Sequence, residues 1–378
     1  MNRAALCSIA LLLAVAPSAV AGPIENLRAG EWYMVPNSHM STVFPNPAPP
    51  GDPWAVIAAW SGGAYDTKRD RLIVWGGGHG DYSGNEIYAF NVGTLSWQRV
   101  NNPTMDVSGD EASGVYPDGR PRSRHTYDGV EYLPPPIDRF CGLGAGGTYP
   151  SAQIGTPRCD CFNFDTLQWE RFADTPAYGH PVCSAYDPVR GHVWEHPPGT
   201  GSQLAEFNPV ANTWTQRGAS SPGDIYYCNG EVDPIRRKFI AIGNGIAASW
   251  NIDAAGTLAR TNLPTSGATA IQSAENPGVA YDPVSDKFVV WNGGADVYTL
   301  NLSTYVWTRI PPAATNTVIP TAPDIRGTYG RFRYIPSKNA FIVVNSTNEN
   351  VYIYKMSAGG GAPADSILPN KINDLRTK

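Results

Sequence analysis

The sequence predicts an all-β fold, a β-propeller of six blades, and three observations support this prediction. The 378 residues include 39 Gly, 34 Pro, 19 Tyr and 11 Trp but only 16% charged residues, as expected for many tight turns between aromatic-rich strands. One pattern of strands and turns recurs about every 50 residues, which is the period of a propeller blade. An additional strand near the N-terminus can complete the last copy of the pattern.

The repeat is clearest in its first copy. A Tyr65-Asp66 turn leads to an apolar strand over residues 72–75, an alternating aromatic strand over 87–91 and a final Trp97. Six copies can be recognised, so we expect six blades, with seven as the alternative count. The remaining copies start at Tyr132, Tyr186, Val232, Tyr281 and Tyr334.

The last copy lacks an outer strand, because its third strand is followed by a Gly-rich segment. Residues 31–35 resemble the missing strand and contain Trp32. Pairing them with residues 334–354 would close the ring and leave no exposed strand edge between the first and last blades. We therefore expect one propeller domain over residues 22–357 and a Gly-rich C-terminal tail over 358–378.

The first 21 residues have the features of a secretory signal peptide. They contain a basic residue, Arg3, an apolar run over residues 9–16 and a small-x-small site, Ala19-Val20-Ala21. We expect a secreted or periplasmic monomer. No later stretch is apolar for long enough to span a bilayer, and the net charge of −5 gives no electrostatic support for binding nucleic acid.

Five of the six cysteines lie beyond the signal segment, and three of them are close in sequence: Cys141, Cys159 and Cys161. An oxidising compartment permits a local disulfide bridge within this group. The alternative is a zinc site that combines the three thiolates with a histidine. We favour the bridge because the chain has no second Cys-x-x-Cys or His-x-x-x-His motif. We expect no required cofactor, with a structural metal ion as the alternative.

The Gly-Gly after the second strand, the Tyr in the third and the Trp in the fourth resemble kelch repeats. This resemblance covers nearly the whole mature chain and implies a propeller like those of the kelch and galactose-oxidase superfamily. It does not imply one activity, because such propellers include enzymes, adhesion modules and scaffolds.

The long loops are expected on one face, where inter-blade loops and the loops between second and third strands meet around a recessed site. Residues 76–86 are rich in glycine and polar side chains, including His79. In an extended segment Arg120, Arg122 and Arg124 would point the same way and suit a carboxylate or sulfate. The catalytic candidates are His79, Tyr82, His125 and Tyr226. The substrate-binding candidates are Trp54, Arg120, Arg122, Arg124, Tyr178, His180, Arg326 and Arg331.

These residue types favour a polysaccharide lyase that cleaves a uronic-acid glycan by β-elimination. That reaction needs a cation to neutralise the carboxylate, a base for the α-proton and an acid for the leaving oxygen. The set is similar to that of propeller lyases acting on sulfated algal polysaccharides such as ulvan. The expected partner is an anionic polysaccharide. The alternatives are a non-catalytic carbohydrate- or protein-binding propeller and a sialic-acid epimerase-like enzyme.

Overall fold

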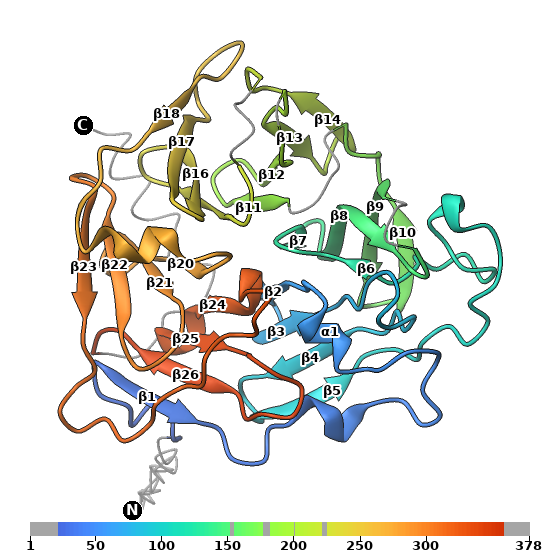
Figure 1. Ribbon diagram of the computed structural model, residues 1–378, viewed down its shortest axis with the longest axis horizontal. Coiled ribbons are helices and arrows are strands. Elements are labelled where there is room, and N and C mark those ends of the chain that lie inside the picture. The colour runs from blue at the N-terminus through green and yellow to red at the C-terminus, as the bar shows by residue number, and fades with distance from the viewer. Residues whose placement is uncertain (1–21, 152–154, 177–181, 200, 221–224, 359–378) are drawn as a thin grey trace, which may run out of the picture.

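A computed structural model describes residues 22–151, 155–176, 182–199, 201–220 and 225–358. Six antiparallel blades surround a central axis (Figure 1), so the predicted six-bladed propeller is confirmed and the seven-bladed alternative is excluded. The first strand of each blade lies innermost and packs against the first strands of its two neighbours. No helix in these ranges has the length and apolar character needed to cross a bilayer.

From the axis outward, the first three blades consist of β2 (Gly63–Asp66), β3 (Arg71–Val74), β4 (Tyr88–Asn91) and β5 (Ser96–Arg99); β7 (Val130–Leu133), β8 (Arg139–Thr148), β9 (Thr156–Asn163) and β10 (Gln168–Arg171); and β11 (Cys183–Asp187), β12 (His192–His196), β13 (Ala205–Asn208) and β14 (Thr213–Gln216). A short strand, β6 (Arg124–His125), pairs with the end of β8.

The last three blades consist of β15 (Asn229–Asp233), β16 (Lys238–Gly243), β17 (Ile246–Asn251) and β18 (Arg260–Asn262); β20 (Gly278–Asp282), β21 (Lys287–Trp291), β22 (Val297–Asn301) and β23 (Val306–Ile310), with β19 (Ser266–Gly267) parallel to β23; and β24 (Phe332–Ile335), β25 (Ala340–Val343), β26 (Tyr352–Lys355) and β1 (Glu31–Met34). The described helices are α1 (Ala55–Ala58) and five 3-10 turns at Met40–Val43, Glu111–Ser113, Thr269–Ser273, Tyr329–Arg331 and Pro336–Lys338.

The repeated Tyr-Asp turn has a local chemical basis. The tyrosine hydroxyl donates a hydrogen bond to a side chain at the far end of the turn, as from Tyr65 to Asp70 (2.6 Å) and from Tyr281 to Asp286 (3.1 Å). The accepting residue has a positive φ, 53° at Asp70 and 55° at Asp286, a conformation that Asp and Asn tolerate better than most residues. The aspartate of the turn, in the copies that have one, accepts a backbone N–H inside the same turn: Asp187 from Val189 at 2.9 Å, Asp233 from Ile235 at 3.0 Å and Asp282 from Val284 at 3.0 Å.

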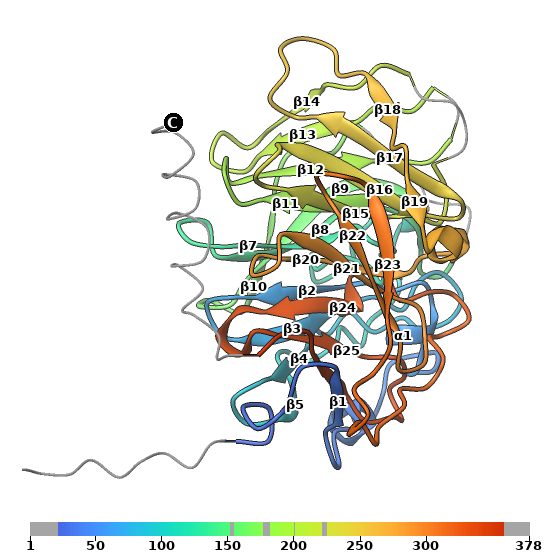
Figure 2. The same cartoon turned by 90° about the vertical axis from the view of Figure 1, so that its left-hand side faces the viewer.

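The ring is closed by the N-terminal strand, as the sequence predicts. Strand β1 pairs with β26 in the register Trp32 opposite Tyr354, and the two strands lie side by side in Figure 1. Figure 2 shows the ring edge-on, with β1 at its lower rim. The Trp32 ring lies 4.8 Å from the Tyr354 ring and 6.0 Å from the Trp291 ring, and its Nε1 donates to the Ala295 carbonyl at 2.9 Å. This one side chain therefore joins the first strand of the chain to the last two blades.

The cysteine group contains a disulfide between Cys141 and Cys161, which lie directly opposite each other on β8 and β9. Cys159 is buried beside them, with its Sγ 3.9 Å from that of Cys161. Burial raises the pKa of the Cys159 thiol well above its usual value. Two of the three proposed zinc ligands are thus held in a disulfide, which supports the bridge over the zinc site.

Candidate functional site

A ring of residues with left-handed backbone surrounds one mouth of the axis, just before the inner strands begin. Its described members are Trp60, Tyr127, Tyr227, Asn276 and Tyr329, with φ between 46° and 58° in each case. Hydrogen bonds link neighbouring members: the Tyr127 N–H donates to the Trp60 carbonyl (2.6 Å) and the Asn276 N–H to the Tyr227 carbonyl (2.8 Å). Non-glycine residues in this conformation are strained and cluster at functional sites. The ring therefore indicates this face as a candidate functional site.

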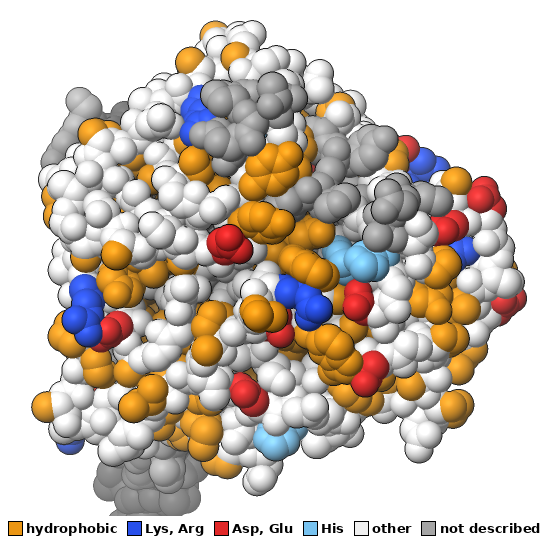
Figure 3. All heavy atoms as spheres, viewed as in Figure 1, with side chains coloured by type: hydrophobic (Ala, Val, Ile, Leu, Met, Phe, Trp, Pro, Cys, Tyr) orange, Lys and Arg blue, Asp and Glu red, His pale blue; other side chains and the backbone are white. Residues whose placement is uncertain are grey.

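Two histidines and one aspartate meet beside this ring. The rings of His79 and His125 have centroids 4.1 Å apart, and Asp81 Oδ2 lies 3.2 Å from His125 Nε2 and 3.9 Å from His79 Nδ1. His79 comes from the loop between β3 and β4, whereas His125 belongs to β6 in the next blade. Two predicted catalytic residues are therefore brought together, and Figure 3 shows histidine beside acidic and basic side chains near the centre of this face.

The two histidines differ in their access to solvent. The His79 side chain is 30% exposed and the His125 side chain only 3%. Both nitrogens of His125 already have partners, because Nδ1 lies 3.4 Å from the Tyr127 hydroxyl and Nε2 faces Asp81. His79 is therefore the histidine that can reach a ligand, and His125 is placed to hold Asp81.

A cation and two indole rings lie beside the histidines. The Trp60 ring packs against His125 at 4.7 Å, and the guanidinium of Arg326 lies 4.6 Å from the Trp60 ring and 5.8 Å from the Trp54 ring. Nη1 of Arg326 donates to the Ala58 carbonyl at 3.0 Å, which fixes the side chain. The Trp54 side chain is exposed. Two predicted substrate-binding residues, Trp54 and Arg326, thus lie next to a second indole ring, that of Trp60.

Close packing around a glycine-rich loop holds this arrangement together. A Cβ added at Gly78 would come within 1.7 Å of the His125 ring, and one added at Gly147 would come within 3.0 Å of His79. Both glycines have positive φ, 66° and 60°. Gly78 and Gly147 therefore leave room for the two imidazoles, which side chains at these two positions would crowd.

Other predicted site residues are buried and stabilise the fold, and do not line the mouth of the axis. Arg124 is fully buried and its Nη2 donates to Asp160 at 2.7 Å. Arg331 is also fully buried, and its guanidinium donates to backbone carbonyls of Ser61, Gly327 and Val344. Burial lowers the pKa of Arg331 to about 10. The expected convergence of these two arginines with the histidines is not found, because carbonyl or carboxylate partners already occupy them.

The expected row of three arginines on one side does not form. Arg122 turns inward and donates hydrogen bonds to five carbonyls, four in the 107–115 loop and one at Tyr149. It therefore holds that loop against the blade. Arg120 is exposed, lies 3.5 Å from Asp118 and donates to the Asn102 carbonyl. The segment is a folded loop and not an extended strand before residue 124, so alternation in sequence does not place these side chains together.

Two predicted tyrosines have different surroundings. Tyr82 is fully buried in the core of the first blade, where its hydroxyl donates to Glu86 at 2.7 Å. Burial and the Glu86 carboxylate raise its pKa far above the usual value. Tyr226 is exposed and lies beside Tyr227, with ring centroids 6.4 Å apart. Tyr178 and His180 lie outside the described residues.

The trio His79, Asp81 and His125 can also hold a metal ion. Each offers one ligand atom, and the three atoms lie within 4.8 Å of one another. Two imidazoles and one carboxylate suit a first-row divalent ion such as Zn²⁺. No step of the chemistry proposed below depends on such an ion.

No protein-family model matches the chain, and no curated protein matches it.

Proposed function

We propose that this protein acts on an acidic glycan at the His79 face and cleaves it by β-elimination. The observation that carries the proposal is the grouping of a solvent-accessible imidazole, a carboxylate fixed beside it and a guanidinium on an aromatic platform. Exposed indole rings suit the apolar faces of sugars, and a guanidinium binds a carboxylate in a bidentate manner. The kelch-like repeat pattern and the expected signal peptide are consistent with a secreted carbohydrate-active propeller.

In this proposal Arg326 binds the uronate carboxylate and withdraws charge from it. The His79 Nε2 removes the proton from the carbon α to that carboxylate, the bond to the leaving glycosidic oxygen breaks, and a carbon–carbon double bond forms. The imidazolium of His79 then returns the proton to the leaving oxygen. One group can thus supply both proton transfers, and no additional reactant is needed.

Asp81 is the acceptor for the tautomer that this reaction requires. In the described arrangement the Gly80 N–H donates to His79 Nδ1 at 2.7 Å, which leaves the proton of the neutral ring on Nε2. A base at Nε2 needs the proton on Nδ1 instead, where it would face Asp81 Oδ2 at 3.9 Å. We infer that substrate binding draws Nδ1–H toward Asp81, while His125 holds the carboxylate in place.

The test is incubation of the protein with a panel of polysaccharides, including polygalacturonate, alginate, ulvan and a neutral glucan as control. We expect ultraviolet absorbance from the unsaturated sugar to appear with one or more uronic-acid polymers and not with the glucan. Binding of an acidic polymer without any unsaturated product would contradict the lyase reaction and favour the binding-module function. An exchange of configuration at a small acidic sugar, without chain cleavage, would favour the epimerase-like alternative.

A further inference from the structure

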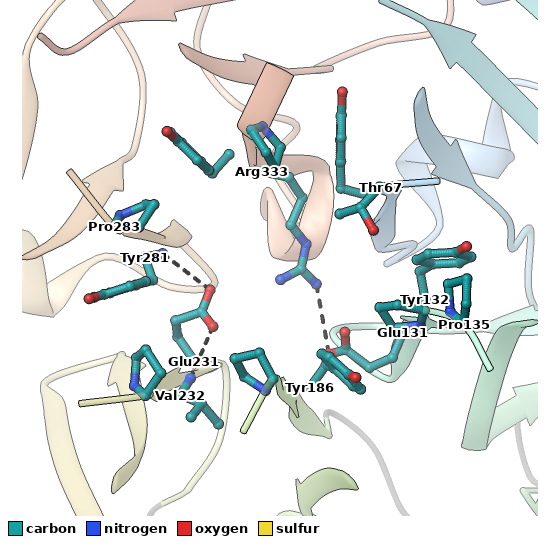
Figure 4. Close-up of a pocket in the computed structure, with 16 residues that line it drawn as sticks. Thr67, Glu131, Tyr132, Pro135, Tyr186, Glu231, Val232, Tyr281, Pro283 and Arg333 are labelled. Carbon is teal, nitrogen blue, oxygen red and sulfur yellow. Dashed lines mark hydrogen bonds and ion pairs between the residues drawn. The ribbon is translucent and has the colours of Figure 1, made fainter. Parts of the chain in front are cut away.

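A cavity lies at the opposite end of the axis from the His79 face. Its volume is about 550 Å³, and it is lined where the inner strands end, by residues of β7, β15 and β24 and by the turns that follow (Figure 4). The ring at the His79 face lies where the same strands begin. The cavity therefore opens at the other end of the axis, and its floor residues Glu131, Glu231 and Arg333 lie within the inner strands β7, β15 and β24.

The wall of this cavity repeats from blade to blade. It is formed by tyrosines and prolines at the ends of the inner strands and in the turns that follow them. Four of the tyrosine hydroxyls already donate hydrogen bonds within their own turns. The rings therefore present mainly apolar surface to the cavity. These four tyrosines are Tyr65, Tyr132, Tyr281 and Tyr334.

A single cation stands at the floor of the cavity. Arg333 donates from Nε to the carbonyls of Gly63 (3.2 Å) and Gly330 (3.0 Å). Among the described residues its two terminal nitrogens donate no hydrogen bond, and its nearest carboxylates, Asp128 and Glu131, lie 3.9 Å from Nη2. Figure 4 shows the guanidinium pointing into the cavity between Glu131 and Glu231. A planar fork whose terminal nitrogens donate no hydrogen bond to the described residues suits an incoming carboxylate.

Two glutamates on opposite sides of Arg333 supply negative charge. Glu131 accepts from the Ser184 hydroxyl (3.0 Å), and Glu231 accepts from the backbone N–H groups of Val232 (2.9 Å) and Tyr281 (3.3 Å). Burial raises the pKa of Glu131, and it raises the pKa of Glu231 to about 7 even though Arg333 acts in the opposite direction. The floor therefore has more acidic than basic groups, and a cation would stabilise its charged form.

We propose that this cavity binds an α-amino acid with a basic side chain. The carboxylate of the ligand binds the Arg333 fork, its two cationic groups face Glu131 and Glu231, and its aliphatic chain packs against the tyrosine and proline rings. A zwitterion with one additional positive charge matches the one guanidinium and two glutamates that line the cavity, whereas an acidic sugar has a carboxylate for Arg333 but no cation for the glutamates. The site is distinct from the His79 face and does not depend on the function proposed there.

The test is calorimetric titration of the full-length protein with L-lysine, cadaverine and L-glutamate. We expect L-lysine to bind and cadaverine to bind at least about tenfold more weakly, because cadaverine has no carboxylate for Arg333. L-Glutamate should bind more weakly still. Affinity for L-lysine should rise from about pH 6 to about pH 8 as Glu231 loses its proton, since Glu131, Asp128 and Arg333 face it from neighbouring strands and the ligand favours the carboxylate.

Two variants separate this site from the other. Glu231→Gln should weaken L-lysine binding at least about tenfold and leave glycan cleavage unchanged, whereas His79→Ala should leave L-lysine binding unchanged. No binding of L-lysine at about 10 mM would overturn the proposal. Equal binding of L-lysine and cadaverine, equal binding by Glu231→Gln, or preferred binding of D-galacturonate would also overturn it. The ligand series in the unmodified protein decides the matter if Glu231→Gln does not fold.

Discussion

Trp32→Ala is expected to lower the free energy of unfolding by about 3–5 kcal/mol, the usual cost of removing a large aromatic side chain from a core. Trp32 is 3% exposed, contacts rings of the fifth and sixth blades and donates a hydrogen bond to Ala295. Its loss leaves a cavity at the joint where the two ends of the ring meet. Deletion of residues 22–36 should have a larger effect, because it also uncovers the edge of β26.

Met34 on the same strand provides the matched control. Its side chain is 41% exposed, so Met34→Ala should change the free energy of unfolding by less than about 0.5 kcal/mol. Urea unfolding followed by tryptophan fluorescence and by circular dichroism measures both variants. Equal stability of the Trp32 and Met34 variants would show that the N-terminal strand does not close the ring in solution.

The second large effect concerns catalysis. His79→Ala should lower kcat on the glycan about 10²–10⁴-fold, the usual contribution of a proton-transfer group, with little loss of stability because the side chain is partly exposed. Asp81→Asn should lower kcat while changing KM little, since an amide can still fill the space but does not accept the Nδ1–H as a carboxylate does. Initial rates across a range of substrate concentrations separate the two parameters.

Arg120→Ala is the control for the site. Arg120 is exposed and interacts with Asp118 and Asn102, away from the described contacts of His79 and Arg326. Its replacement should leave kcat and KM unchanged, whereas Arg326→Ala should raise KM and lower kcat together. Full activity of His79→Ala would contradict the proposed role, and a loss of activity in Arg120→Ala would move the site to the 101–123 loop.

The fold could be predicted because each repeat is marked by interactions between residues that are close in sequence. The aspartate that caps each turn and the tyrosine that donates across it, such as Asp282 and Tyr281, are both visible in sequence. Closure could be predicted for a similar reason, because three strands in the last copy leave an edge that only residues 31–35 can fill. The disulfide between Cys141 and Cys161 needed the register of β8 and β9, which sequence spacing does not define.

The site could be predicted only in part. His79 and His125 were accessible to prediction because they lie in or beside the long loops that the repeat pattern places on one face. The roles of the buried arginines could not be predicted. Arg122 and Arg331 donate hydrogen bonds to backbone carbonyls, and the positions of these carbonyls depend on how distant loops fold. Trp60 and Tyr127 carried a signal that was overlooked: each lies five residues before a turn tyrosine, at the same repeat position as Tyr329.

The most direct test of the central claim is a crystal structure of the His79→Ala protein soaked with a uronic-acid hexasaccharide from the polymer that responds most strongly in the cleavage assay. The account predicts sugar density over Trp54 and Trp60, with a uronate carboxylate within hydrogen-bonding distance of Arg326 and the α-carbon facing the space vacated by His79. Density confined to another face, or to the cavity around Arg333, would contradict it.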